Sequence, residues 1–181
     1  MAHQQQYDFV QKLRSNFGYY FAGKKVLEVG SLDINGSLRS LFVQCDYTGI
    51  DLSPGKGVDV VCLGHEYNDP DCSFDTVLSA ECFEHNPYWF ETFTNMIRLC
   101  KNSGLVFFTC ATTGRIEHGT TRSLPESSPF TIQKGWEYYK NLTEQDFREK
   151  LDFDKTFNYY GFEVDHSNHD LYFWGVKATK V

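Results

Sequence analysis

The feature that most constrains this chain is the alternation of short apolar runs with helix-forming segments through its first 111 residues. The apolar runs are continuous and lack the polar residue at every second position that marks a strand with one face in water. Continuous runs of this kind fit strands buried on both faces, as in a parallel sheet covered by helices. We therefore predict an α/β fold with a doubly wound sheet, mostly parallel, and with an antiparallel strand near the C-terminus.

Apolar spacing and turn residues place the individual elements. Strands are expected at residues 25–30, 47–51, 58–62, 74–79 and 105–110, with a closing antiparallel pair at 162–164 and 171–176. Helices are expected at 4–17, at 35–42 with Asn35 as the N-cap, from Asn86-Pro87 to Ser103-Gly104, and from Leu142 onward. Thr143 and Asp146 have the spacing of a capping box, in which each side chain satisfies the other residue's backbone N–H.

The length fits a single domain over residues 1–181, because no repeat or linker divides the chain. No apolar run approaches the roughly 20 residues that cross a bilayer, and the N-terminus has neither the basic nor the apolar part of a signal peptide. We therefore expect a cytoplasmic protein without membrane contact. The six cysteines form no C-x-x-C pair, and no metal site is expected. The oligomeric state is not predicted by the sequence.

The net charge of −7 is concentrated in one segment. Between Asp51 and Asn86 the chain has eight acidic residues and one lysine, whereas the remainder of the chain is neutral. Binding of nucleic acid relies on Lys and Arg side chains that neutralise phosphates. An acidic chain of this kind is therefore not expected to bind nucleic acid.

Two of the expected strands end in residues suited to a nucleotide. In doubly wound sheets, ligands bind at the carboxyl ends of the strands, near the point where the strand order reverses. The first strand ends at Gly30, which lets a ligand approach the backbone, and Asp51 ends the second strand 21 residues later. A carboxylate at this spacing can accept hydrogen bonds from a ribose diol, and the neighbouring Leu52 can lie against a purine.

Three motifs together resemble those of class I S-adenosylmethionine-dependent methyltransferases, in particular the small-molecule, type 11-like members. They are Glu28-Val-Gly30 with Asn35-Gly36, then Gly49-Ile-Asp51, and then Ser73-Phe-Asp75 continuing through Glu81 to Glu84-His85. The resemblance covers residues 24–111, as the cofactor-binding half of a Rossmann-like domain. It implies S-adenosylmethionine (SAM) as the cofactor and S-adenosylhomocysteine as the product.

The resemblance also implies a role for each residue around the cofactor. Glu28 would brace the first turn, with Gly30 and Ser31 near the methionine part, Asp51 on the ribose, Leu52 on the adenine, Gly64, His65 and Glu66 along the adenine edge, and Ala80 and Glu81 near the sulfonium. Asp33 either meets the ammonium group of the cofactor or is a solvated turn residue.

The first loop departs from the family pattern, because Gly30 and Gly36 are six residues apart instead of four. The acid that many members have after the third strand is also replaced, by Leu63 or Gly64. Two other readings of the nucleotide site stay open for this reason. One is a domain that binds NAD(P) or a nucleotide sugar, and the other is a domain without a small ligand.

The long segment 112–141 leaves the carboxyl end of the fifth strand, where the methyl acceptor is expected. Methyl transfer needs alignment and, for some acceptors, a base, for which His118 in this segment and His85 after the fourth strand are candidates. The expected acceptor-binding residues are Arg115, Glu117, Arg122, Tyr138 and Tyr139. Since two arginines could grip a carboxylate or phosphate, we expect a small-molecule acceptor such as a sugar or an anionic metabolite. Residues 1–23 and 112–141 are expected to form a lid over it, through Phe17, Tyr19, Tyr20 and Phe21 in the first segment and Trp136, Tyr138 and Tyr139 in the second.

Two alternative functions remain. The chain could be a non-catalytic SAM-binding or interaction module. It could also be a nucleic-acid methyltransferase, because Asn86-Pro87-Tyr88-Trp89 is similar to the Asn-Pro-Pro-Tyr motif of enzymes that methylate amino groups of DNA. The second Pro is missing, however, and helix capping accounts for Asn86-Pro87.

Overall fold

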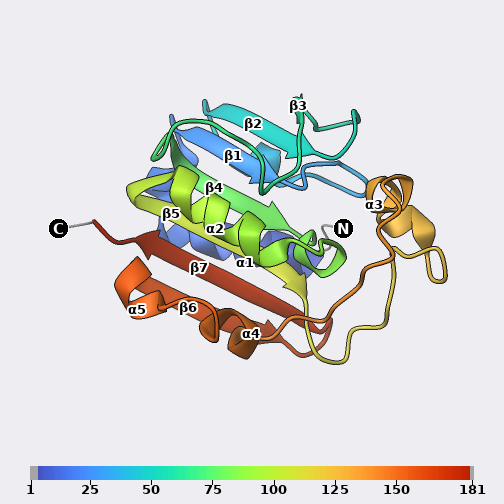
Figure 1. Ribbon diagram of the computed structural model, residues 1–181. Helices are drawn as coiled ribbons and strands as arrows, with labels where there is room; N and C mark the ends of the chain where they lie inside the picture. The colour runs from blue at the N-terminus through green and yellow to red at the C-terminus, as the bar shows by residue number, and fades with distance from the viewer. Residues whose placement is uncertain (1–3, 180–181) are drawn as a thin grey trace.

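A computed structural model describes residues 4–179 of the chain, and in this range seven strands form one sheet (Figure 1). The strand order is β3-β2-β1-β4-β5-β7-β6. The strands are β1 (Lys25–Val29), β2 (Asp46–Asp51), β3 (Val60–Val61), β4 (Phe74–Ala80), β5 (Cys100–Ala111), β6 (Phe157–Asp165) and β7 (Asp170–Lys177). Neighbouring strands from β3 to β5 are parallel, while β7 is antiparallel to both β5 and β6. The predicted α/β fold with its antiparallel C-terminal strands is confirmed.

Helices cover both faces of this sheet (Figure 1). The α-helices are α1 (Gln4–Asn16), α2 (Trp89–Leu99), α3 (Pro129–Gln133), α4 (Glu144–Arg148) and α5 (Phe153–Thr156), and the 3-10 turns are η1 (Gly18–Phe21), η2 (Leu38–Leu41), η3 (Phe83–His85) and η4 (Pro125–Ser127). One apolar cluster lies between the sheet and α1, η1 and η2, and a second lies between the sheet and α2, α4 and α5. No helix in the described part of the chain is long and apolar enough to cross a membrane.

Burial on both faces explains why the apolar runs are continuous. Along β5, Leu105 and Phe107 belong to the cluster under α1, while Val106 and Phe108 belong to the cluster under α2. Successive side chains of a strand point to opposite faces, so a strand between two cores has no position for a solvated residue.

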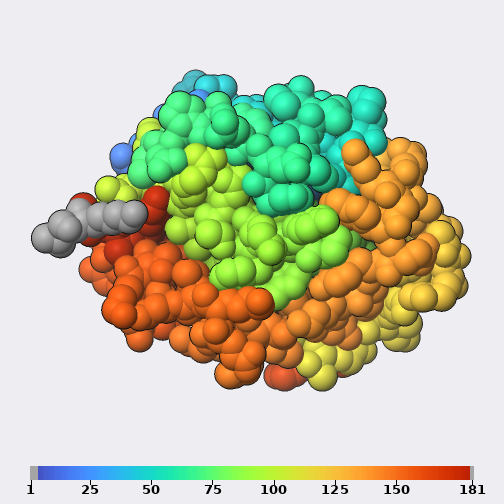
Figure 2. Space-filling model, in the orientation of Figure 1, coloured from blue at the N-terminus to red at the C-terminus, as the bar shows by residue number. Residues whose placement is uncertain are grey.

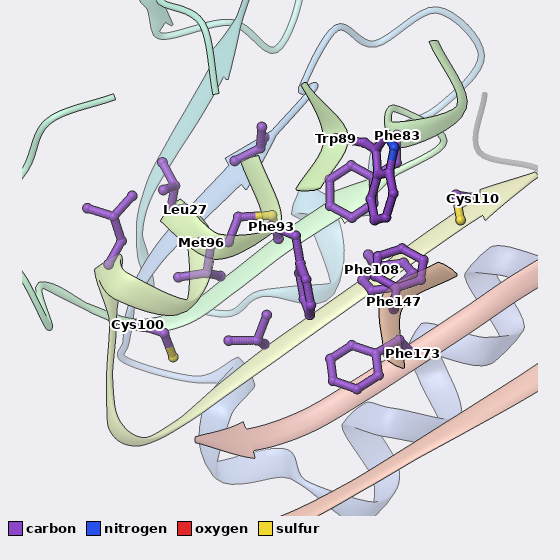
Figure 3. Close-up of a cluster of buried hydrophobic side chains, with 14 of the residues drawn as sticks. Leu27, Phe83, Trp89, Phe93, Met96, Cys100, Phe108, Cys110, Phe147 and Phe173 are labelled. Atoms are coloured by element: carbon purple, nitrogen blue, oxygen red, sulfur yellow. The ribbon is translucent and has the colours of Figure 1, made fainter. Parts of the chain in front are cut away.

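Phenylalanine rings dominate the core under α2, α4 and α5 (Figure 3). The ring of Phe108 on β5 lies 4.7 Å from Phe147 of α4, 5.2 Å from Phe173 of β7 and 5.3 Å from Phe93 of α2. Stacked and edge-to-face pairs of this kind are worth about 0.5–1.5 kcal/mol each beyond their burial. Many aromatics of the C-terminal part therefore hold the antiparallel strands and their short helices to the parallel sheet.

Several boundaries differ from those predicted from the sequence. The helix expected at 35–42 is a single 3-10 turn, and Ser37 instead of Asn35 caps it, by accepting a hydrogen bond from the Arg39 N–H. The third strand shortens to two residues. Asn86 organises the turn before α2, because its side chain accepts from the Tyr88 N–H, but the helix itself begins at Trp89. The capping box of α4 is present as predicted.

The sheet order creates a crevice at the carboxyl ends of the parallel strands. From β1 the chain moves outward to β2 and β3, and then returns to pair β4 on the other side of β1. The loops that follow β1 and β4 therefore leave in opposite directions, which opens the usual ligand-binding crevice of such sheets.

A buried carboxyl group lies inside the sheet next to this crevice. Glu28 of β1 is 6% exposed, and its Oε2 accepts a hydrogen bond of 2.8 Å from the Tyr47 hydroxyl of β2. Burial raises the pKa of Glu28 to about 7, although the Tyr47 hydrogen bond and the charge of Arg39 act in the opposite direction.

Replacement of Glu28 by Gln should flatten the pH dependence of stability. Between pH 4.5 and about 7 the folded protein binds more protons at Glu28 than the unfolded chain does. The free energy of unfolding therefore falls as the pH rises through this window, by up to about 3 kcal/mol. Urea denaturation at a series of pH values should show this fall in the parent protein and a smaller one in Glu28→Gln. The exposed Glu66→Gln is the matched control, and equal slopes in the parent and Glu28→Gln would contradict the assignment.

Candidate functional site

A pocket occupies the crevice at the carboxyl ends of β1 to β4. Its empty space is about 960 Å³, a volume that includes solvent at the mouth. The predicted residues that line it are Glu28, Gly30, Ser31, Asp51, Leu52, Gly64, His65, Ala80, Glu81 and His85. The structure thus brings most of the predicted cofactor residues together in one place.

The floor of the pocket depends on Gly30. Its backbone has a φ of +78°, and a Cβ there would lie 2.7 Å from the Cβ of Cys82, in the loop after β4. A side chain at this position would be strained and would collide with Cys82. Gly30 therefore lets the loops after β1 and β4 meet beneath the pocket.

Asp51 is held rigidly at the end of β2. Its two carboxylate oxygens accept hydrogen bonds from the N–H groups of Leu32, at 2.9 Å, and Leu52, at 2.7 Å. Burial raises the pKa of Asp51, while these two backbone hydrogen bonds lower it. Each carboxylate oxygen has further lone-pair positions, so the group can still accept hydrogen bonds from a ligand in the pocket.

Glu81 follows β4 in a strained conformation. Its φ is +50°, a value that residues other than glycine adopt infrequently, and the residue is 7% exposed. The Glu81 N–H donates to the Thr109 carbonyl of β5, which fixes the backbone. Strained residues held by surrounding structure concentrate at functional sites, and Glu81 faces this pocket.

The wall opposite the strands comes from residues 127–136. Ser127, Ser128, Pro129, Phe130, Thr131 and Trp136 line the pocket. Phe130 packs against Gly55 in the loop after β2. A Cβ added at Gly55 would lie only 3.1 Å from the Phe130 ring. Trp136 packs on Tyr88 at 5.7 Å between ring centroids, and Tyr88 packs on His65 at 4.4 Å. The segment with α3 therefore closes the pocket against the loops of the parallel strands, as the right-hand side of Figure 2 shows.

Both candidate bases lie together at one end of the site. The rings of His85 and His118 are 4.9 Å apart, and Tyr139 lies 5.6 Å from the first and 5.1 Å from the second. Burial lowers the pKa of His85 to about 3, and it also lowers that of His118. His85 lines the pocket, whereas His118 lies behind it. A Cβ at Gly119 would lie 2.6 Å from His85, so this glycine lets the loop pack against that ring.

Other predicted site residues lie outside the pocket lining. Asp33 pairs with Lys56 at 2.7 Å and accepts from the Gly36 N–H, as a turn residue does. The side chain of Glu66 is 63% exposed. Arg122 pairs with Glu117 at 2.9 Å, and Arg115 pairs with the buried Asp170 at 3.4 Å. Tyr138 packs against the core, and Tyr139 contacts the two histidines.

The N-terminal part of the expected lid also lies elsewhere. Residues 1–3 are outside the described range, and α1 packs on the face of the sheet. In η1, Tyr20 accepts at its carbonyl from Thr76 at the beginning of β4, and its hydroxyl donates to the Ser103 carbonyl. These partners lie at the amino ends of the strands, opposite the pocket.

Sequence reasoning missed several lining residues. Beyond the serines and Phe130 of the 127–136 wall, they include Ile34, Ser37, Leu38, Cys62, Cys82 and Asn86. The sequence of residues 127–131 has no helical or strand periodicity, although Ser128-Pro129 is a recognisable helix start. Their role depends on a chain reversal that local sequence does not encode.

Solved structures share this fold. Phosphoethanolamine N-methyltransferase 2 from Haemonchus contortus, solved with S-adenosyl-L-methionine, is 18% identical over 97% of this chain and 53% of its own, with a TM-score of 0.66. The 1,6-didemethyltoxoflavin-N1-methyltransferase from Burkholderia thailandensis, solved with its substrate and S-adenosylhomocysteine, is 14% identical over 99% of this chain and 92% of its own, with a TM-score of 0.61. The chain thus spans about half the length of the first of these proteins.

A comparison with curated proteins finds no match. A family model described as a methyltransferase domain matches residues 1–167, which include every residue that lines the pocket. Because this match covers most of the 181 residues, the chain belongs to the methyltransferase domain family.

Proposed function

We propose that this protein transfers the methyl group of SAM to a small-molecule acceptor, releasing S-adenosylhomocysteine. The observation that carries the proposal is the pocket at the reversal of strand order, with Gly30 on its floor and Asp51 and Glu81 on its walls. The transfer is an in-line displacement at a carbon already activated by the positive sulfur. The protein's task is to bind and align the cofactor and acceptor.

The polar groups of the pocket suit SAM. Ser31 Oγ and His65 Nδ1 are buried and have no hydrogen-bond partner among the described residues, so both are available to a ligand. Three acidic residues, Glu28, Asp51 and Glu81, line the pocket, of which Glu28 is only partly ionised near neutral pH because burial raises its pKa to about 7, and no Lys or Arg lines it in the described chain. A cofactor with a sulfonium and an ammonium group complements this charge, whereas the phosphates of NAD(P) or a nucleotide sugar do not.

The acidic lining of the pocket argues against the anionic acceptor expected from the sequence. The anionic acceptor expected from the sequence required free arginines, but Arg115 and Arg122 are both paired with acids outside the pocket. An uncharged or cationic molecule fits a lining without basic side chains better. We therefore propose a neutral or cationic small-molecule acceptor, such as a sugar or an amine.

The acceptor is proposed to lie beside His85, which is close to Ser128 of the 127–136 wall. His85 would contact the acceptor directly. His118 does not line the pocket and would act as a positioning residue through its contact with His85. Residues 127–136 would form the lid, in place of the more extensive lid expected from the sequence.

Binding of the cofactor should stabilise the fold. A ligand at about 100 times its dissociation constant adds about 2.7 kcal/mol, which raises the Tm of a protein of this size by roughly 5–11 °C. We expect this shift with SAM and with S-adenosylhomocysteine, but not with NAD. Differential scanning fluorimetry provides the measurement, and the absence of a shift with both SAM compounds would refute the cofactor assignment.

Two aspartates provide a matched test of the cofactor position. Asp51→Ala should weaken SAM binding by about 1–3 kcal/mol, because it removes charge-assisted hydrogen bonds. Asp33→Ala should leave the affinity nearly unchanged, since Asp33 pairs with Lys56 and does not line the pocket. Isothermal titration calorimetry compares the two variants, with Asp51→Asn as a milder replacement that keeps one acceptor oxygen. Equal affinities for the parent and Asp51→Ala would remove Asp51 from the cofactor site.

A screen of acceptors tests the charge argument. In an assay of S-adenosylhomocysteine release, we expect kcat/KM for sugars and amines to exceed that for carboxylates and phosphates of similar size by about tenfold or more, or about 1.4 kcal/mol in transition-state binding. A preference for anions would instead mean that the acceptor meets Arg115 or Arg122, outside the pocket described here.

A further inference from the structure

We propose that Glu84, His85 and His118 form a binding site for a divalent metal ion of the zinc type. The three side chains come from η3 and from the loop after β5, and all are buried. Each offers one ligand atom, and these atoms lie within 4.8 Å of one another. The site is independent of the cofactor proposal, because its ligands can bind a metal whether or not SAM is present.

Glu84 lies in an unusual environment for a carboxylate. Its side chain is fully buried, and neither carboxylate oxygen has a hydrogen-bond partner among the described residues. A buried carboxylate without partners costs several kcal/mol, so such groups are paired, protonated or bound to a metal. The neighbouring imidazole does not supply a partner, since His85 Nε2 lies 3.9 Å from Glu84 Oε1, which is too far for a hydrogen bond.

The His118 ring is held in an orientation that suits a metal ligand. Its Nδ1 lies 3.0 Å from the Ile116 carbonyl, a group that can only accept, so that Nδ1 carries the proton of the neutral ring. The lone pair is then on Nε2, on the other side of the ring. Histidines that bind metals are usually oriented in this way, because the N–H of their second ring nitrogen donates a hydrogen bond to a carbonyl or carboxylate. The Tyr139 hydroxyl donates to the same carbonyl and steadies it.

The surrounding charge also favours a cation. Glu81, three residues before Glu84, is buried as well, and so is Asp170. Arg115 is the neighbouring base, but it already pairs with Asp170 and donates to the Asn168 carbonyl. A divalent ion between Glu84 and the two imidazoles would compensate the buried carboxylates.

The ligand set indicates the class of metal. Two imidazoles and one carboxylate bind Zn²⁺ and similar ions, with bonds of about 2.0–2.2 Å that leave neighbouring ligand atoms about 3.4 Å apart in tetrahedral geometry. The three ligand atoms lie within 4.8 Å of one another, so an ion would draw them together by small side-chain rotations. Three protein ligands leave one position open, and His85 connects the cluster to the pocket wall. A bound ion would thus lie next to the proposed acceptor end, with the histidines acting as ligands and not as proton acceptors.

The signal for this site is not visible in the sequence. Glu84-His85 and His118 belong to different segments, and neither has the spacing of a known metal motif. The expectation of no metal rested on the cysteines, which take no part in the cluster.

The test is a titration of the metal-free, tag-free protein with Co²⁺, which reports its coordination through visible absorption bands. We expect about one Co²⁺ per chain, with the intense bands of a four- or five-coordinate ion, and displacement of Co²⁺ by Zn²⁺. Glu84→Gln and His118→Gln should each weaken Co²⁺ binding about 100-fold or more and abolish the bands. His166→Gln, which alters an exposed histidine outside the cluster, should bind as the parent does.

Circular dichroism establishes that each variant is folded. If Glu84→Gln fails to fold, His118→Gln and the X-ray absorption spectrum of the Zn²⁺-loaded parent decide, since the spectrum should show two imidazoles, oxygen and no sulfur. Absence of stoichiometric binding, unchanged bands in His118→Gln, or a sulfur ligand would overturn the proposal. A SAM-induced rise in Tm without metal binding would reject the metal site alone and leave the cofactor proposal standing.

Discussion

The pairing of β1 with both β2 and β4 is the constraint on which the rest of the structure depends. Because β1 lies at the point where the strand order reverses, the loops after β1 and β4 separate and leave room for a ligand. The separation is narrow at its base, where Gly30 meets Cys82. A larger residue at position 30 would push these loops apart and remove the floor of the pocket. Sheet topology and one glycine thus define the site before any polar contact is considered.

The antiparallel strands complete the domain through aromatic packing. Phe173 of β7 contacts Phe93 and Phe108, so the C-terminal strands share one core with the parallel sheet. This placement also positions the long connection from β5 to β6. The connection leaves at the ligand side of the sheet, crosses the pocket with α3, and returns to the core at Leu142 and Phe147. The segment that lines the pocket is thus anchored at both ends by buried elements.

The charge of the acidic segment is distributed in a way that composition does not show. Several of its acids pair with bases from the neutral remainder of the chain, among them Asp59 with Arg39, Asp71 with Arg98 and Asp75 with Lys101. These pairs are partly exposed, and each is worth little in stability. Of the other acids in this segment, Asp51 and Glu81 line the pocket, while the buried Glu84 lies outside its lining. The acidic character of the pocket therefore comes from Asp51 and Glu81 of this segment together with Glu28 of β1.

Local signals in the sequence were enough to predict the fold class, the positions of most strands along the chain and many of the residues that line the pocket. Continuous apolar runs specify buried strands, and Gly30 and Asp51 stand at strand ends whose position follows from the topology. The extent of η2 and β3, the course of residues 127–136 along the pocket and the Glu84–His85–His118 cluster depend on tertiary contacts. Arg115 and Arg122 were expected at the acceptor because of their position in the chain. In the structure they pair with the acidic residues Asp170 and Glu117. These features escape prediction because packing and ion pairing between distant segments leave no periodicity or residue spacing in the local sequence.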